Sequence, residues 1–95
     1  MPLYTFFFDY RCTTFTSQVH AEKPEHAPSN WAEQQTSLLL KVPGIGRKTI
    51  VRLLSDLAEP ENHPTAIPWL HNAYHLSVLI RGYTAFIDFV KTEEE

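Results

Sequence analysis

The residues most suited to chemistry fall in one short segment, 42–49, which reads Val-Pro-Gly-Ile-Gly-Arg-Lys-Thr. Its two glycines have no side chain, so a ligand can approach the main chain closely. A turn that leads into a helix can also aim several backbone N–H groups at a phosphate. The cations after the second glycine would add charge-assisted hydrogen bonds. The candidate nucleic-acid-binding residues are Gly44, Ile45, Gly46, Arg47, Lys48 and Arg52.

The charge pattern around this segment supports the same hypothesis. The window 36–55 contains four cations and no Asp or Glu. A proline and two glycines are, however, also what any tight connection between two helices needs, because glycine tolerates positive φ without a steric clash. Phosphate binding and a plain interhelical turn are therefore both open interpretations of the same residues.

The segment resembles the hairpin of the helix-hairpin-helix motif of DNA repair and replication proteins, in the form that endonuclease III-type DNA glycosylases have. The resemblance covers residues 38–57 at most. It implies contact with the DNA backbone without sequence preference. The implied roles are backbone amides from Gly44 and Gly46, a pin between the two helices from Ile45, and positive charge from Arg47 and Lys48.

The resemblance does not extend to catalysis. In the glycosylases a lysine at the position of Lys48 attacks the sugar, and an aspartate further along the chain completes the site. The position of that aspartate is Ala66 here. Ile50 stands where the family has a small residue, and only one hairpin is present. The resemblance therefore implies binding rather than glycosylase activity.

Other residues that could carry catalysis or hold a metal lack partners at a workable spacing. His71 and His75 are four apart, but the surrounding pattern favours a strand, in which such residues stand about 13 Å apart. No serine lies in a Gly-x-Ser-x-Gly context. Asp9 and Asp88 lie in apolar segments and would be neighbours only if those segments pair. We therefore expect no enzymatic activity, no cofactor and no metal site.

The elements that must position the 42–49 segment begin with two strand-like runs. Leu3–Tyr10 places four aromatic residues on one face at period two, and this pattern is typical of a core face that packs against helices. Thr14–Ala21 follows after a tight connection at 11–13, so the two runs predict a β-hairpin. The aromatic residues are Tyr4, Phe6, Phe8 and Tyr10.

Two helices are predicted in the middle of the chain. We expect the first from Trp31 to Lys41, with Asn30 and Glu33 as a capping pair. The second has apolar residues at i, i+3, i+4 and i+7 and ends before Pro60. Prolines then recur every four residues over 60–68 and predict a linker without helix. The apolar positions of the second helix are Ile50, Leu53, Leu54 and Leu57.

A second hairpin is predicted near the end of the sequence. Tyr74–Ile80 and Ala85–Lys91 are rich in Val, Ile, Phe and Tyr, and Gly82 marks the turn between them. The predicted fold is therefore α+β, with the order ββααββ and a four-stranded antiparallel sheet that carries two helices on one face. We expect a single domain over residues 1–92 and a frayed acidic tail over 93–95.

Composition narrows the class of partner. The chain has 95 residues, a formal net charge of −3 and one cysteine, Cys12. One cysteine suits a reducing cytoplasm, and no apolar run approaches the roughly 20 residues that span a bilayer, so we expect a cytoplasmic protein with no membrane partner. The acidic balance argues against a dedicated nucleic-acid binder. We predict binding to a protein partner, or to a second copy through an open sheet edge, with nucleic-acid binding as the alternative.

The layout of the first third points the same way. An opening hairpin, then Glu22–Ala27 and a helix, resembles the start of HicB-type antitoxins. Those are small cytoplasmic domains that work by binding a protein partner. The resemblance lies in the order of elements and implies a protein-binding function.

Overall fold

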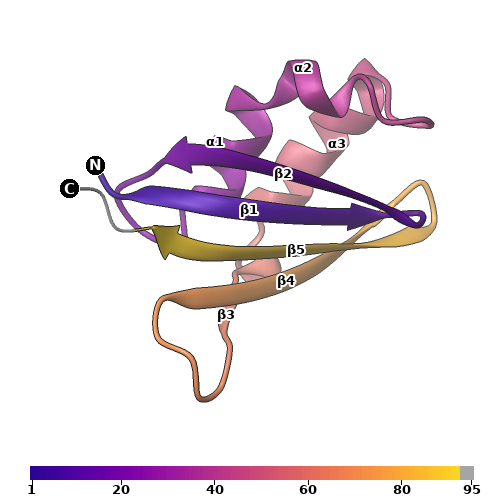
Figure 1. Cartoon of the computed structure of the whole chain (residues 1–95). Helices are drawn as coiled ribbons and strands as arrows, with labels where there is room; N and C mark the ends of the chain where they lie inside the picture. The colour runs from indigo at the N-terminus through magenta and orange to yellow at the C-terminus, as the bar shows by residue number, and fades with distance from the viewer. Residues whose placement is uncertain (93–95) are drawn as a thin grey trace.

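In the computed structural model, which describes residues 1–92, three helices lie on one face of an antiparallel sheet (Figure 1). The strand order is β2-β1-β5-β4-β3. The strands are β1 (Leu3–Tyr10), β2 (Thr13–His20), β3 (Thr65–Ala66), β4 (Ala73–Ile80) and β5 (Tyr83–Thr92). The helices are α1 (Ala27–Gln34), α2 (Thr36–Leu39) and α3 (Arg47–Ala58), with a 3₁₀ turn η1 (Pro60–Asn62) after α3.

The predicted α+β class is confirmed, but the predicted ββααββ order is wrong. The described residues form five strands rather than four, and three helices rather than two. The extra strand is β3, which pairs with the start of β4 over two residues. The predicted acidic tail, 93–95, lies outside the described residues.

Both predicted hairpins are present, and both close through two-residue turns. Arg11 and Cys12 connect β1 to β2 with φ of 49° and 66°, and Arg81 and Gly82 connect β4 to β5 with φ of 52° and 82°. Two consecutive residues at positive φ make the type I′ turn, whose twist matches that of the flanking strands. The β1–β5 pairing then places both turns at the same end of the sheet (Figure 1).

The predicted first helix, Trp31–Lys41, is wrong in its bounds. Helix α1 begins at Ala27, so that Pro28 lies in the first turn, where the missing N–H has no helical partner to lose. The chain breaks at Gln35, and the Thr36 hydroxyl donates to the carbonyl oxygens of Ala32 and Glu33. Such back-bonding competes with helical hydrogen bonds. The helix therefore continues only as the short α2.

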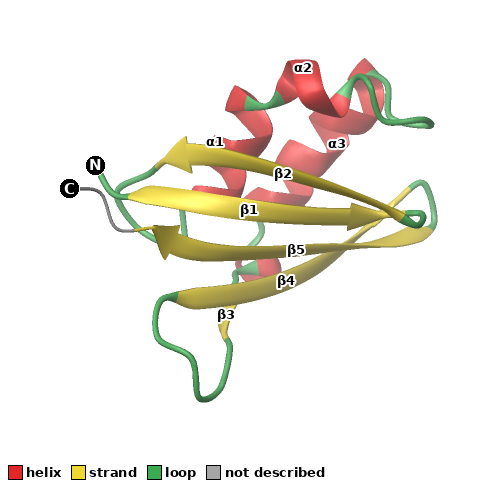
Figure 2. Cartoon of the chain, in the orientation of Figure 1, coloured by secondary structure: helices red, strands yellow, loops and turns green. Residues whose placement is uncertain are grey.

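The predicted linker over 60–68 is also wrong in part. Pro60 begins the 3₁₀ turn η1, because a proline fits the first position of a helical turn, and the side-chain amide of Asn62 donates to the Asp56 carbonyl at 2.8 Å. Thr65 and Ala66 then pair with β4. Figure 2 shows the loop that leads from β3 to β4. The proline-rich segment therefore still forms regular structure, but η1 and β3 are both short.

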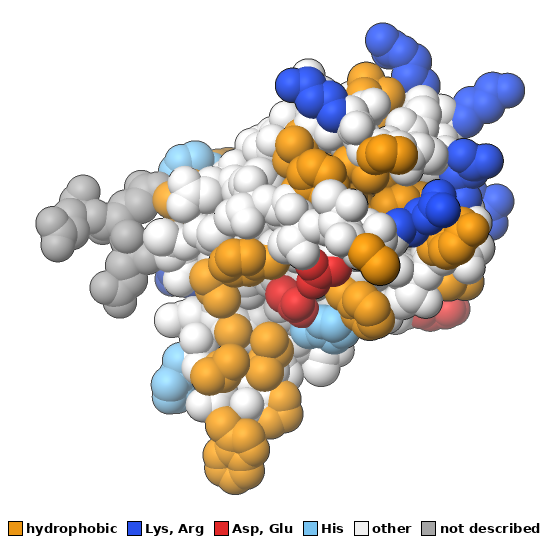
Figure 3. Space-filling view, turned by 45° about the vertical axis from the view of Figure 1, so that its right-hand side comes forward, with side chains coloured by type: hydrophobic (Ala, Val, Ile, Leu, Met, Phe, Trp, Pro, Cys, Tyr) orange, Lys and Arg blue, Asp and Glu red, His pale blue; other side chains and the backbone are white. Residues whose placement is uncertain are grey.

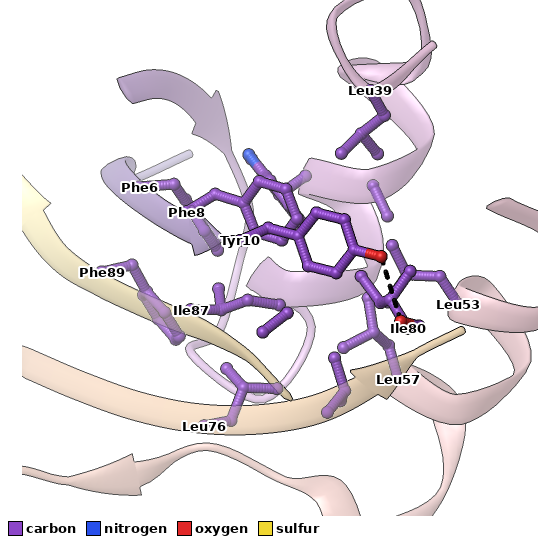
Figure 4. Close-up of a cluster of buried hydrophobic side chains, with 14 of the residues drawn as sticks. Phe6, Phe8, Tyr10, Leu39, Leu53, Leu57, Leu76, Ile80, Ile87 and Phe89 are labelled. Atoms are coloured by element: carbon purple, nitrogen blue, oxygen red, sulfur yellow. Dashed lines mark hydrogen bonds between the residues drawn. The ribbon is translucent and has the colours of Figure 1, made fainter. Parts of the chain in front are cut away.

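The aromatic stripe of β1 is confirmed as the centre of the core. Its four rings are at most 2 % exposed and face the helices. Trp31 of α1 stacks on Phe6, with 5.3 Å between ring centroids, and its indole N–H donates to the Ser17 hydroxyl at 2.8 Å. The Tyr10 hydroxyl donates to the Ile80 carbonyl at 3.1 Å, which ties β1 to β4 across β5 (Figure 4).

Candidate binding site

The Pro-Gly-Ile-Gly turn lies between α2 and α3, as predicted. Gly44 has a φ of +87°, a conformation that favours glycine, and Gly46 is the residue before the first turn of α3. Ile45 is buried, with 5 % of its surface exposed, and its N–H donates to the Val42 carbonyl at 3.1 Å. Ile45 is therefore part of the hydrophobic core.

Two arginines that sequence reasoning missed lie beside this turn. Arg81 donates from Nη1 to the Gly44 carbonyl at 3.1 Å. A Cβ added to Gly44 would lie 3.6 Å from Nη1 of Arg81 and 3.8 Å from Nη1 of Arg11. The Arg11 guanidinium also lies over the Tyr83 ring, 4.3 Å from its centroid. Each arginine is the first residue of a hairpin turn, but only the β1–β5 pairing brings both turns to the helical hairpin.

The arginines and the predicted cations form what we call the basic end. It contains six of the eight Lys and Arg residues of the chain, although the net charge is −3. Figure 3 shows these blue side chains gathered on one side of the molecule. The net charge of the chain is therefore negative although this region is strongly positive. The basic end consists of Arg11, Lys41, Arg47, Lys48, Arg52 and Arg81.

A groove of about 780 Å³ opens at this end, between α3 and the outer edge of β4. Lys48, Arg52 and Asp56 line it from α3, and because they are spaced four residues apart they lie along one side of the helix. Arg81 lines it from the β4–β5 turn. None of the three cations has an ion-pair partner among residues 1–92. The groove thus carries three cations and one carboxylate.

Among residues 1–92, the β4 edge that borders the groove has no partner strand other than β3. Ile80 and Tyr83 close a two-residue hairpin turn and so exchange hydrogen bonds with each other. Alternate residues, among them Ser77 and Leu79, therefore direct their N–H and C=O away from β5. Ala73 is one of these alternate residues, and its outward carbonyl accepts a hydrogen bond from the Ile67 N–H at 3.0 Å. In the described range β3 pairs only with Tyr74 and His75, so the edge is open from Ser77 onward.

The opposite edge, β2, is covered in part. The same alternation points the carbonyls of Gln18 and His20 outward. Gln35 donates its side-chain amide to the Gln18 carbonyl at 3.2 Å, and Asn30 donates to the His20 carbonyl at 3.4 Å. Asn30 therefore does not cap α1, contrary to the predicted Asn30–Glu33 pair, and no side-chain cap bond forms there. Helix α1 instead supplies donors that occupy one half of this edge.

The remaining titratable residues do not assemble a second site. Asp9 accepts a hydrogen bond from Thr14, and Asp88 pairs with His75, so each carboxylate has its own partner on the face of the sheet away from the helices. Burial raises the pKa of the Tyr4 hydroxyl, and the nearby Tyr74 and Glu25 raise it further. Within the described part of the chain no three His, Cys, Asp or Glu side chains are placed to hold a metal ion. No helix among residues 1–92 is long and apolar enough to span a bilayer.

Comparisons with family models, with curated proteins and with solved structures found no match to this chain. The groove, the open β4 edge and the basic end are therefore the features of the molecule that bear on its function.

Proposed function

We propose that this chain is a non-enzymatic cytoplasmic module that binds a protein partner by strand addition at the open edge of β4. The observation that carries the proposal is an unpaired strand edge beside a groove of about 780 Å³. In strand addition, main-chain hydrogen bonds supply affinity and the neighbouring groove selects side chains. Ser77 and Leu79 would supply the main-chain groups. The single cysteine, Cys12, which is exposed and forms no disulfide, supports the cytoplasmic part of the proposal.

The two edges of the sheet differ in ways that favour β4 over β2. The β2 edge already receives two side-chain hydrogen bonds from α1 and its C-cap residue, so a partner strand would have to displace them. A new strand on β4 displaces nothing there and continues the line that β3 begins. An open strand edge also favours aggregation, and proteins usually protect such an edge when it binds no partner.

Paired proline variants test the proposed edge. Leu79→Pro and Thr16→Pro each remove an outward N–H from an exposed residue of an edge strand, and neither breaks a bond to the neighbouring strand. A library of displayed extended peptides is selected on wild type, and the enriched peptides are then titrated against both variants after circular dichroism has shown that each is folded. We expect affinity to fall at least roughly tenfold for Leu79→Pro and to be kept for Thr16→Pro. The reverse pattern would assign binding to β2, and enrichment of no peptide would overturn strand addition.

Binding of a nucleic-acid backbone is the second candidate, and one observation favours it. Arg11 and Arg81 each bring a guanidinium nitrogen within 4 Å of the place that a Cβ of Gly44 would take. A phosphate held there would meet guanidinium groups on two sides. This candidate predicts binding that weakens steeply with salt and is lost in Arg47→Glu/Lys48→Glu. Fluorescence anisotropy with a short duplex and a single strand, at two salt concentrations, measures both effects.

A further inference from the structure

We propose that the groove between α3 and β4 selects an extended peptide segment whose side chains are acidic. This inference rests on the proposed function, because it names the chemistry of the strand that would pair with β4. Two observations carry it together: the groove has an open main-chain edge on one wall, and it has unpaired cations on the other. A neutral or basic strand would satisfy the edge but would leave the cations without partners.

The α3 wall is graded in charge along its length. Lys48 and Arg52 lie toward the start of α3, and Asp56 lies one turn after Arg52. The Arg81 turn also lies at the start of α3, because Arg81 bonds to Gly44 just ahead of the helix. The positive part of the groove is therefore the end nearest the β4–β5 turn. Acidic side chains of the bound segment should lie at that end, and a neutral or basic side chain should lie opposite Asp56.

The Arg81 guanidinium is held in place by one hydrogen bond and keeps other N–H groups that can donate to a ligand. It spends one N–H on the Gly44 carbonyl and has four further donors. A carboxylate next to the β4–β5 turn could therefore accept hydrogen bonds from a side chain that is already oriented. Orientation before binding lowers the entropic cost of the contact. Lys48 and Arg52, both exposed, would contribute mainly long-range attraction.

The geometry sets the length of the segment. The open edge runs from Ser77 to Ile80 and presents two outward residues, Ser77 and Leu79. An extended chain covers about 3.3 Å per residue, so roughly four to six residues would fill the edge and reach both ends of the groove. The side chains of such a segment alternate between the two faces of the sheet. Acidic residues are therefore required only at alternate positions, on the side that faces α3.

Synthetic peptides that differ in one property at a time test this selection. The probes are capped eight-residue peptides that alternate Val with Glu, Val with Gln, or Val with Lys, together with a Val–Glu peptide that is N-methylated at every amide, so that neither of its edges keeps main-chain donors. We expect the Glu peptide to bind at least roughly tenfold more tightly than the Gln peptide, and N-methylation to abolish binding because it removes main-chain donors. Titration by fluorescence anisotropy at low and physiological salt gives the affinities.

Charge-matched variants locate the effect in the groove. Lys48→Gln/Arg52→Gln removes two groove cations, whereas Lys41→Gln/Arg47→Gln removes two cations of the basic end that do not line the groove. Only the first pair should weaken the preference for Glu over Gln peptides, and the preference that remains is assigned to Arg81, which both variants keep. Asp56→Asn should strengthen binding of the Glu peptide a few-fold, since it removes the carboxylate of the groove.

The outcomes separate this inference from the proposed function. If the Glu and Gln peptides bind equally and the N-methylated Glu peptide does not bind, strand addition stands and acidic selection is overturned. If the N-methylated Glu peptide binds as well as its parent, attraction is purely electrostatic and both are overturned. Absence of binding by all three parent peptides also overturns both. A short DNA duplex that binds more tightly than the Glu peptide, and loses affinity in Lys41→Gln/Arg47→Gln, would assign the basic end to a nucleic acid instead.

Discussion

The β1–β2 and β4–β5 hairpins have the same turn geometry but very different outer edges. Each is closed by a two-residue turn with arginine in the first position, and each contributes one strand to the central β1–β5 pair. The β2 edge lies near α1, whose side chains reach its carbonyls. The β4 edge faces a groove instead, and in the described range 1–92 the only strand along that edge, β3, is two residues long. The difference shows where this fold leaves main-chain groups available to a partner.

Helix α1 is the cause of that difference. Trp31 is fully buried against Phe6 and Phe8 and bonds to Ser17 of β2, so α1 lies where its neighbours reach the β2 edge. Helix α3 has no such anchor on β4. Its apolar side packs on the core through Ile50, Leu53 and Leu57, while its polar side borders the groove. One edge is thus covered in part by side chains that a buried aromatic residue helps to position, and the other lies beside the groove cations.

Removing the Trp31 side chain should have the largest effect and should make the two edges more alike. Trp31→Ala deletes a fully buried indole, which costs about 3–5 kcal/mol of unfolding free energy. Urea denaturation measures the loss, and amide hydrogen exchange reports whether β2 opens more than β4. Trp69→Ala is the matched control, because Trp69 is fully exposed and should change stability by less than about 0.5 kcal/mol. Equal losses in the two variants would contradict the role given to α1.

One serine in each edge strand gives the next test. Ser17→Ala removes the acceptor of the Trp31 indole N–H and leaves a donor without a partner, at a cost of about 1–3 kcal/mol. Ser77→Ala, in β4, removes an exposed hydroxyl and should cost less than about 0.5 kcal/mol. Thermal or urea unfolding of both variants measures the contrast. A neutral Ser17→Ala would show that packing alone holds α1 against β2.

The sequence predicted the hairpins well because their signals are local. Period-two aromatics in 3–10 and β-branched runs near the end of the chain specify strands without knowledge of any distant contact. The heptad-like apolar spacing of α3 is equally local, and three of its four apolar residues are buried as expected. The wrong helix bounds arise where two local tendencies compete, helix formation and side-chain hydrogen bonding to the main chain. Thr36 could continue a helix by propensity, yet its hydroxyl bonds back to the main chain and ends α1.

The groove and the arginine contacts could not be predicted, because both depend on strand order. The residues of the Pro-Gly-Ile-Gly segment were found from their types and spacing, but Arg11 and Arg81 join them only through the β1–β5 register. The open β4 edge likewise exists because β3 begins only at Thr65, after the chain has formed η1, so the residues before Thr65 do not pair with β4. Sequence patterns identify which residues can bind an anion. Tertiary pairing decides which of them share a surface.

Exchanging the second turn residue gives the smallest expected effect and compares the hairpins directly. Cys12 has a φ of 66° and Gly82 a φ of 82°, so the β4–β5 turn has the residue that this conformation favours and the β1–β2 turn does not. Cys12→Gly should raise the unfolding free energy by about 0.5–1 kcal/mol, since the relief of strain at positive φ exceeds the added entropy of the unfolded chain. Gly82→Cys should lower it by a similar amount, and no atom lies within 4 Å of a Cβ added there to change that balance. Urea denaturation in reducing buffer measures both changes, and changes of the same sign in the two variants would contradict the shared turn geometry.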